Sequence, residues 1–176
     1  KRQVPLHKLL STCIDAAARG CDRIRRVQES GATDATLKIA GDAKSALTAA
    51  DLAAQAAVVG ALAKAWPGLT IVGEEDEAAL DEDHELDTPL DDALLDWECT
   101  TSVDLSKARV FVDPLDGTRE FVEGRLDAVQ CLVGVAVGDA PVCGAVGLPF
   151  PADGGPPRVI TLLLVVPWDQ VTRRGR

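Results

Sequence analysis

Apolar positions at helical spacing occupy the first part of the chain. Between Leu6 and Cys21 they recur three or four residues apart, which predicts an amphipathic helix. An alanine-rich second helix is predicted over residues 51–65, where the sequence Trp-Pro-Gly follows as an end signal. The pattern therefore places two helices before the first strand.

Short apolar runs replace the helical pattern further along the chain. They predict strands at about 69–73, 108–113, 128–137 and 141–148. The sequence Gly-Asp-Ala between the last two strands favours a hairpin. The apolar stretch from Val159 to Val166 has two interpretations, a further strand or part of a tail unrelated to the rest. Helices followed by mainly antiparallel strands predict an α+β layered domain rather than a Rossmann alternation.

Charge and cysteine content restrict the partners and the compartment. The 176 residues include 18 basic and 28 acidic ones, a net charge of −10, which is unsuited to capturing nucleic acid. No apolar run is long enough to span a membrane, so we expect neither nucleic-acid nor membrane partners. Five cysteines without a C-x-x-C pair favour buried, reduced thiols and a cytoplasmic location. Residues 76–104 are rich in acids and are interpreted as a solvent-exposed insertion.

The segment DPLDGT at 113–118 carries the strongest chemical signal. Pro cannot donate a further ladder N–H and Gly-Thr turns the chain, so we predict that Asp113 and Asp116 lie on one tight turn. The carbonyl of Leu115 would point between them, and Mg2+ prefers such oxygen ligands. Taken alone, the segment fits a plain strand-to-turn corner better, in which Asp caps a helix and Gly supplies a special backbone angle.

Two further acidic motifs favour the metal interpretation. Glu74 and Glu75 lie in G-E-E-D directly after a predicted strand, and Asp51 ends T-A-A-D where the second helix begins. This order of motifs resembles the inositol monophosphatase superfamily of Mg2+-dependent, Li+-sensitive phosphatases. Residues 113–137 are most similar to the 3′(2′),5′-bisphosphate nucleotidases. The resemblance covers about residues 4–150 and implies the inositol-monophosphatase-like sugar phosphatase fold.

Charge repulsion is the physical reason to expect metal at these motifs. Three carboxylates close together persist only if protons or cations neutralise them, and at pH 7 divalent metal does so. By resemblance, Glu74, Asp113 and the Leu115 carbonyl bind the activating Mg2+. Asp113 and Asp116 bind a second ion, and full-length relatives use two or three. Two ions can polarise a phosphoryl oxygen, generate hydroxide and stabilise the leaving oxygen.

The attacking water requires its own residues. The resemblance implies that Thr118, hydrogen-bonded to Asp51, orients the water, with Asp51 as the proton acceptor. Glu75 would hold a metal-bound water or support Glu74. Asp51 also fits a helix N-terminal residue stabilised by the helix dipole, and the two roles are compatible. The N–H groups of Gly117 and Thr118, if they open a helix, offer an anion site for the phosphate.

The end of the chain departs from the superfamily. Relatives continue into an α/β domain that supplies another metal-binding Asp from W-D-x-x-A and most substrate contacts. Here we expect residues 1–150 to form the N-terminal metal-binding phosphatase domain, and 151–176 an out-of-family tail or truncated remnant. The C-terminal α/β domain would be largely absent, and the Trp168-Asp169 pair is interpreted as coincidence. We therefore expect one weak Mg2+ site, and low or no activity.

Three functions remain open at this point. The resemblance implies hydrolysis of the 3′-phosphate of adenosine 3′,5′-bisphosphate to AMP and phosphate. The pair Glu120-Phe121 favours this small phosphorylated substrate over an inositol phosphate, which is the first alternative. The second alternative is a non-catalytic metal-binding remnant. The oligomeric state is not predicted.

Overall fold

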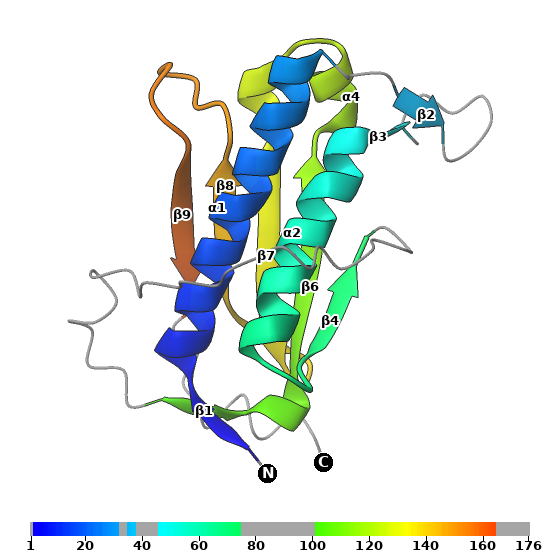
Figure 1. Cartoon of the computed structure of the whole chain (residues 1–176). Coiled ribbons are helices and arrows are strands. Elements are labelled where there is room, and N and C mark those ends of the chain that lie inside the picture. Colours follow the sequence, from blue (N-terminus) through cyan, green and yellow to red (C-terminus); the bar gives the residue numbers. More distant parts are fainter. Residues whose placement is uncertain (1, 32–34, 38–45, 75–100, 165–176) are drawn as a thin grey trace.

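A pair of helices covers one face of a five-stranded sheet in the computed structural model, which describes residues 2–31, 35–37, 46–74 and 101–164 (Figure 1). The helices are α1 (Leu6–Ser30) and α2 (Ala49–Ala65). The strands, in spatial order, are β4 (Thr70–Gly73), β6 (Ala108–Asp116), β7 (Gln130–Val137), β8 (Ala140–Leu148) and β9 (Arg158–Leu163). Strand β4 is parallel to β6 and the other pairs are antiparallel. The predicted α+β layered fold is confirmed.

Short elements complete the described chain. They are the antiparallel pairs β1 (Gln3–Pro5) with β5 (Ser102–Asp104) and β2 (Ala35–Leu37) with β3 (Ala46–Thr48), the helix α4 (Thr118–Val122), and the 3-10 turns η2 (Leu105–Lys107) and η3 (Leu126–Ala128). Strand β5 belongs to the end of the expected acidic insertion, so these last residues are anchored to the N-terminal segment. Residues 75–100 lie outside the described part.

Both predicted long helices are confirmed, and each is longer than its pattern indicated. Helix α1 ends at Gly31, whose left-handed conformation (φ 75°) lets its N–H donate to the carbonyl of Gln28. Helix α2 begins after Thr48, whose side chain accepts a hydrogen bond from the N–H of Ala50. Trp66, at the end of α2, donates from its indole N–H to Thr12 Oγ1 on α1 at 3.0 Å, which ties the two helices together.

The core lies between the helices and the face of the sheet that they cover. Small residues allow close approach: a Cβ on Gly147 in β8 would lie 2.5 Å from the sulfur of Cys21 on α1. Four of the five cysteines belong to the described part of the chain, and these are buried and in no disulfide, namely Cys13, Cys21, Cys131 and Cys143. Burial raises the pKa of the Cys21 thiol to about 12, so this group is neutral and unreactive at pH 7.

The opposite face of the sheet is more exposed and carries several large apolar side chains. Its exposed side chains include Val72, Phe111, Ile160 and Leu162. Strand β9 pairs with β8 along Arg158–Leu163, so the first of the two interpretations of the apolar stretch after residue 158, a further strand, is correct for this part. Neither α1 nor α2, nor any other described helix, has the length and apolar character needed to cross a membrane.

Candidate active site

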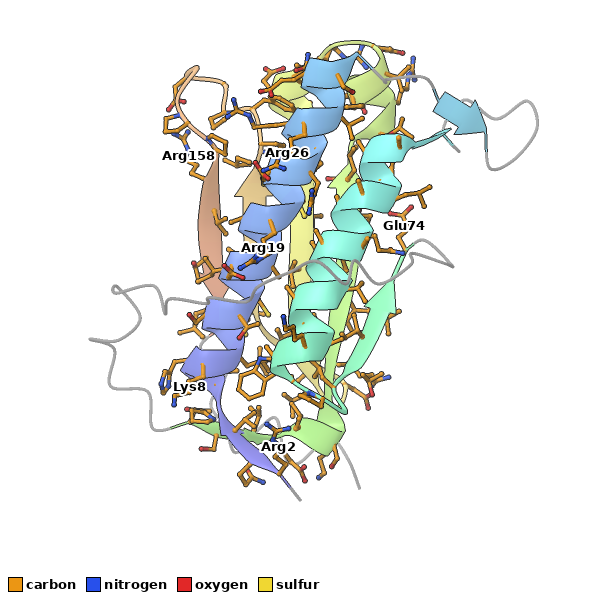
Figure 2. All side chains as sticks on the ribbon, in the orientation of Figure 1. Arg2, Lys8, Arg19, Arg26, Glu74 and Arg158 are labelled. Atoms are coloured by element: carbon orange, nitrogen blue, oxygen red, sulfur yellow. The ribbon has the colours of Figure 1, made fainter. Side chains whose placement is uncertain are left out.

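Parallel pairing of β4 and β6 brings two acidic motifs together. Gly73 lies opposite Val112, and the N–H of Glu74 donates to the carbonyl of Val112 at 3.0 Å. Because parallel strands end at the same edge of a sheet, Glu74 lies beside Asp113, although they are 39 positions apart in the sequence. Figure 2 shows Glu74 just past the end of β4, next to α2. The prediction that both strands end in neighbouring carboxylates is confirmed.

A bulge in β6, rather than a tight turn, sets the spacing of Asp113 and Asp116. Asp113 pairs with Leu132 and Asp116 with Gln130, so three steps along β6 match two along β7. The extra residue shifts the alternation of faces, and Asp116 is exposed where a regular strand would bury it. Pro114 fits here because an interrupted ladder needs no N–H from it. The expected tight turn at 113–116 is therefore wrong, and the strand continues to Asp116.

The chain turns at Gly117 instead. This residue has φ 88°, and a Cβ on it would lie 2.9 Å from the carbonyl oxygen of Ala128. Gly117 is thus required both by its backbone conformation and by the close approach of the η3 segment. Helix α4 follows at Thr118 and is anchored by Phe121, which is 1% exposed. The condition stated for the predicted anion site, that Gly117 and Thr118 open a helix, is met.

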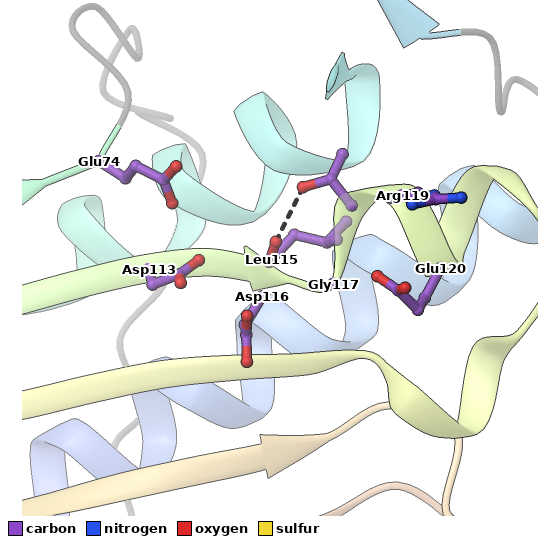
Figure 3. Close-up of a pocket in the computed structure, with 8 residues that line it drawn as sticks. Glu74, Asp113, Leu115, Asp116, Gly117, Arg119 and Glu120 are labelled. Carbon is purple, nitrogen blue, oxygen red and sulfur yellow. Dashed lines mark hydrogen bonds between the residues drawn. The ribbon is translucent and has the colours of Figure 1, made fainter. Parts of the chain in front are cut away.

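These elements surround one acidic cavity of about 360 Å³ (Figure 3). Its lining residues are Glu74, Asp113, Leu115, Asp116, Gly117, Thr118, Arg119 and Glu120. In Figure 3 the carboxylates of Glu74 and Asp113 face the same space from adjacent strands. The cavity therefore combines all four predicted metal-binding residues with both predicted substrate-binding residues.

Asp113 is electrostatically strained in this cavity. Burial, the charge of Glu74, a hydrogen bond shared with Glu74, and the charge of Asp116 raise the pKa of Asp113 to about 7. Its Oδ1 atom is buried and receives no hydrogen bond from any described residue. An oxygen that lacks donors beside two further acids fits a cation. The described residues nevertheless contain no group of three His, Cys, Asp or Glu side chains already arranged around one ion position.

Asp51 belongs to the same site as Asp113, but both of its carboxylate oxygens accept hydrogen bonds. Its Oδ2 accepts from the N–H of Thr48 at 2.7 Å and from Thr48 Oγ1 at 2.6 Å. Its Oδ1 accepts from Thr118 Oγ1 at 3.0 Å, which is the predicted link between these two residues. Thr118 Oγ1 also lies 3.1 Å from the carbonyl oxygen of Leu115, the contact dashed in Figure 3. Asp51 therefore both caps α2 and connects it to the DPLDGT segment.

Gly73 and Gln55 pack against each other directly before Glu74, and the sequence analysis gave neither of them a role in the site. Gln55, on α2, is 2% exposed. A Cβ on Gly73 would lie 2.5 Å from its Oε1 atom. The glycine thus lets α2 pack against the end of β4, directly before Glu74. The signal available in the sequence was the polar Gln within an alanine-rich helix, four residues after Asp51.

Of the remaining residues, two lie outside the described part of the chain and two line the cavity. Glu75, predicted to be catalytic, and Asp169 lie outside the described residues. Arg119 and Glu120 also line the cavity. Glu120 entered the sequence analysis only through the pair Glu120-Phe121, which favoured the nucleotide substrate, and for Arg119 the position directly after DPLDGT was the only sequence signal.

A family model for the inositol monophosphatase family matches residues 6–161. The chain belongs to the inositol monophosphatase family. The match extends past residue 150, where we expected the out-of-family tail to begin, and it includes the first part of β9. The match to the family therefore covers both long helices, the acidic motifs and most of the sheet.

Curated relatives and solved structures agree with this family. The chain is 32% identical over 148 residues to 3'(2'),5'-bisphosphate nucleotidase 1 of Dictyostelium discoideum, covering 81% of this chain and 47% of that protein. The human protein of the same name is 33% identical over 150 residues, covering 82% and 48%. The chain thus spans about half the length of these relatives. In fold it resembles the extragenic suppressor protein suhB from Bartonella henselae, with a TM-score of 0.60, 21% identity, and coverage of 89% and 48%.

Proposed function

We propose that the acidic cavity is the Mg2+-binding half of a phosphomonoesterase site that acts on adenosine 3′,5′-bisphosphate. The observation that carries this proposal is the state of Asp113. Its pKa is raised to about 7, and its buried Oδ1 lacks a donor among the described residues. A bound divalent cation would neutralise Asp113 and its neighbours without a proton.

The donor set of the cavity fits Mg2+. We propose that Glu74, Asp113 and the Leu115 carbonyl hold one ion and that Asp113 and Asp116 hold a second, since all these ligands are oxygens. Bound Mg2+ would polarise the phosphoryl group and lower the pKa of a coordinated water. The N–H groups of Gly117 and Thr118 would bind the phosphate, and Glu75 would hold a water.

Thr118 and Asp51 would handle the proton of the attacking water. The Thr118 hydroxyl donates its single proton to Asp51 Oδ1 and can accept a hydrogen bond from water through a lone pair. As the water oxygen bonds to phosphorus and the ester P–O bond breaks, the water proton moves to Thr118 and the Thr118 proton to Asp51. The leaving 3′-oxygen takes a proton from solvent. Thr48 holds the Asp51 carboxylate in place throughout.

Names of the relatives favour a nucleoside bisphosphate substrate. Beyond the two nucleotidases, the chain is 30% identical over 154 residues to the human Golgi-resident adenosine 3',5'-bisphosphate 3'-phosphatase. An inositol phosphate is the second candidate, because inositol monophosphatase 3 of Xenopus tropicalis is 30% identical over 150 residues. Both substrates would use the same acidic cavity, so selectivity must come from residues around it.

Phosphate release measured with both substrates tests the proposal. We expect the chain to release phosphate from adenosine 3′,5′-bisphosphate in the presence of Mg2+, with inhibition by Li+ and by chelator. Faster release from inositol monophosphate would favour the second candidate. A chain that binds no Mg2+ in calorimetric titration and releases no phosphate from either substrate would contradict the proposed function.

A cytoplasmic location is a separate proposal. It is supported by the four buried cysteines that form no disulfide among the described residues. A fluorescent fusion of the chain should show diffuse cytoplasmic signal. Concentration in Golgi membranes, the location in the name of one relative, would contradict it.

A further inference from the structure

One basic side chain faces an otherwise acidic or neutral cavity. Of the eight described lining residues, four are acids, and Arg119 alone is basic. Arg119 lies on α4, directly after Thr118, on the wall of the cavity opposite β4 (Figure 3). A phosphate bound at the metal-binding acids and Thr118 would therefore have this guanidinium at the edge of its pocket.

A second phosphate on the substrate would need such a cation. A phosphate monoester carries a charge of about −1.5 to −2 at pH 7. The proposed Mg2+ ions balance the phosphate that is cleaved, whereas a second phosphate would meet Glu120 and the remaining negative field of the cavity. Without a positive partner, that repulsion would select against bisphosphorylated substrates.

One ion pair holds Arg119 in place. Its Nε donates to Glu123 Oε1 at 2.8 Å, one helical turn further along α4. The two terminal nitrogens of the guanidinium make no hydrogen bond that involves another described residue, so they keep a fork of donors suited to phosphate oxygens. Arg125 pairs with Glu120 at 2.9 Å and with Glu123 at 2.7 Å, which offsets the charge of Glu120 without lining the cavity.

We propose that Arg119 binds the second, non-cleaved phosphate of a bisphosphorylated substrate and thereby makes the site prefer bisphosphates to monophosphates. This inference rests on the proposed phosphatase function and adds a specificity-determining residue to it. Arg119 acts on binding alone, so the cleavage step at the metal-binding acids and Thr118 does not depend on it.

A comparison of two substrates with and without the second phosphate tests Arg119. Adenosine 3′,5′-bisphosphate and adenosine 3′-monophosphate share the cleaved group, and their KM and kcat, together with their Kd by calorimetry in Mg2+, are measured for each variant. We expect Arg119→Gln to weaken binding of the bisphosphate by about tenfold to a hundredfold, as for a lost charge-assisted hydrogen bond, and to leave the monophosphate unchanged. Arg119→Lys should recover part of the loss, because it keeps the charge but not the fork.

Two control variants separate this role from loss of charge alone. Arg26 on α1 makes an equivalent i,i+4 pair with Asp22 at 2.9 Å, and Figure 2 shows it remote from Glu74. Arg26→Gln should change neither substrate. Arg125→Gln, which has the same exposed side-chain fraction as Arg119, should not change the ratio of the two affinities.

Each result has a definite meaning. Equal losses for both substrates in Arg119→Gln, or wild-type affinities that do not distinguish them, would overturn the inference while leaving the phosphatase function standing. Absence of bisphosphate binding by the Mg2+-loaded wild type would also overturn it. Selective bisphosphate binding without any phosphate release would support the role of Arg119 and contradict the proposed function instead.

Discussion

Asp51 and Asp113 belong to one site, yet the hydrogen bonding of their carboxylates is opposite. Asp51 is 2% exposed and accepts three hydrogen bonds, two from Thr48 and one from Thr118. Asp113 is only half-buried, but its Oδ1 atom receives none from the described residues and its pKa is raised to about 7. Hydrogen-bond donors thus surround the Asp51 carboxylate, whereas burial and the charges of Glu74 and Asp116 raise the pKa of Asp113.

This difference separates the two tasks proposed for the site. The donors around Asp51 keep it in one orientation, so it can receive a proton at a defined atom. The Oδ1 atom of Asp113 has no such donor among the described residues and is left for a cation. The bulge in β6 produces this arrangement, because it places Asp113 and Asp116 on the open face while Leu115 is buried.

Removal of a metal-binding acid should have the largest effect. We expect Asp116→Asn to reduce Mg2+-dependent phosphate release to background, because the site loses one full charge and one of the two carboxylates proposed to hold the second ion. Phosphate release in Mg2+ and circular dichroism of the same sample check that activity is lost without unfolding. Substantial Mg2+-dependent turnover in Asp116→Asn would show that the DPLDGT segment is not the catalytic centre.

Stability without metal should change in opposite directions at the two aspartates. Asp51→Asn replaces an acceptor of three hydrogen bonds and should lower the free energy of unfolding by about 1–3 kcal/mol. Asp113→Asn removes a repulsive charge and should leave stability unchanged or raise it at pH 8. Urea unfolding of the two variants in the presence of chelator measures both free energies. Equal destabilisation by the two substitutions would remove the contrast between these residues.

The pH dependence of stability should follow Asp113. Its pKa in the fold lies above that of the unfolded chain, so the folded state holds the proton more tightly. The stability that this proton contributes is fully present below about pH 4 and is lost as the pH rises through about 7. In the presence of chelator, the urea concentration at the midpoint of unfolding should decrease when the pH is raised from 5 to 8. This decrease should be larger in the wild type than in Asp113→Asn. Added Mg2+ should restore more stability at pH 8 than at pH 5, because protons compete for the same carboxylate.

Much of the fold could be predicted because its patterns are local. The spacing of apolar residues in α1 and α2 and the apolar runs of β6, β7 and β8 each lie within one segment. Strands β1 and β5 were missed because each has three residues and exists only through its pairing with the other. No local pattern of that length separates a strand from a loop.

The candidate site could likewise be predicted only where its signal is local in the sequence. Motif order identified Glu74, Asp51 and the DPLDGT segment, which the fold brings to one place. The bulge was missed because Asp-Pro and Asp-Gly are typical of turns, whereas the register with β7 decides the backbone path. Arg119 was missed because an isolated Arg after a motif carries no signal until the cavity is known.

A substitution at Gly73 should have the smallest effect. It tests whether the packing of α2 against the end of β4 positions Glu74. In Gly73→Ala the new methyl group would lie 2.5 Å from Gln55 Oε1, so this buried side chain must move. Because the end of a Gln side chain can rotate, we expect a cost of only about 1 kcal/mol, at the low end for overpacking. Glu74 follows Gly73 directly, so Mg2+ affinity should also fall, by several-fold. Gly134→Ala in β7 is the matched control, since its Cβ meets no atom within 4 Å. Titration calorimetry and urea unfolding of the two variants should therefore separate them, and identical behaviour would show that packing of α2 on β4 does not position Glu74.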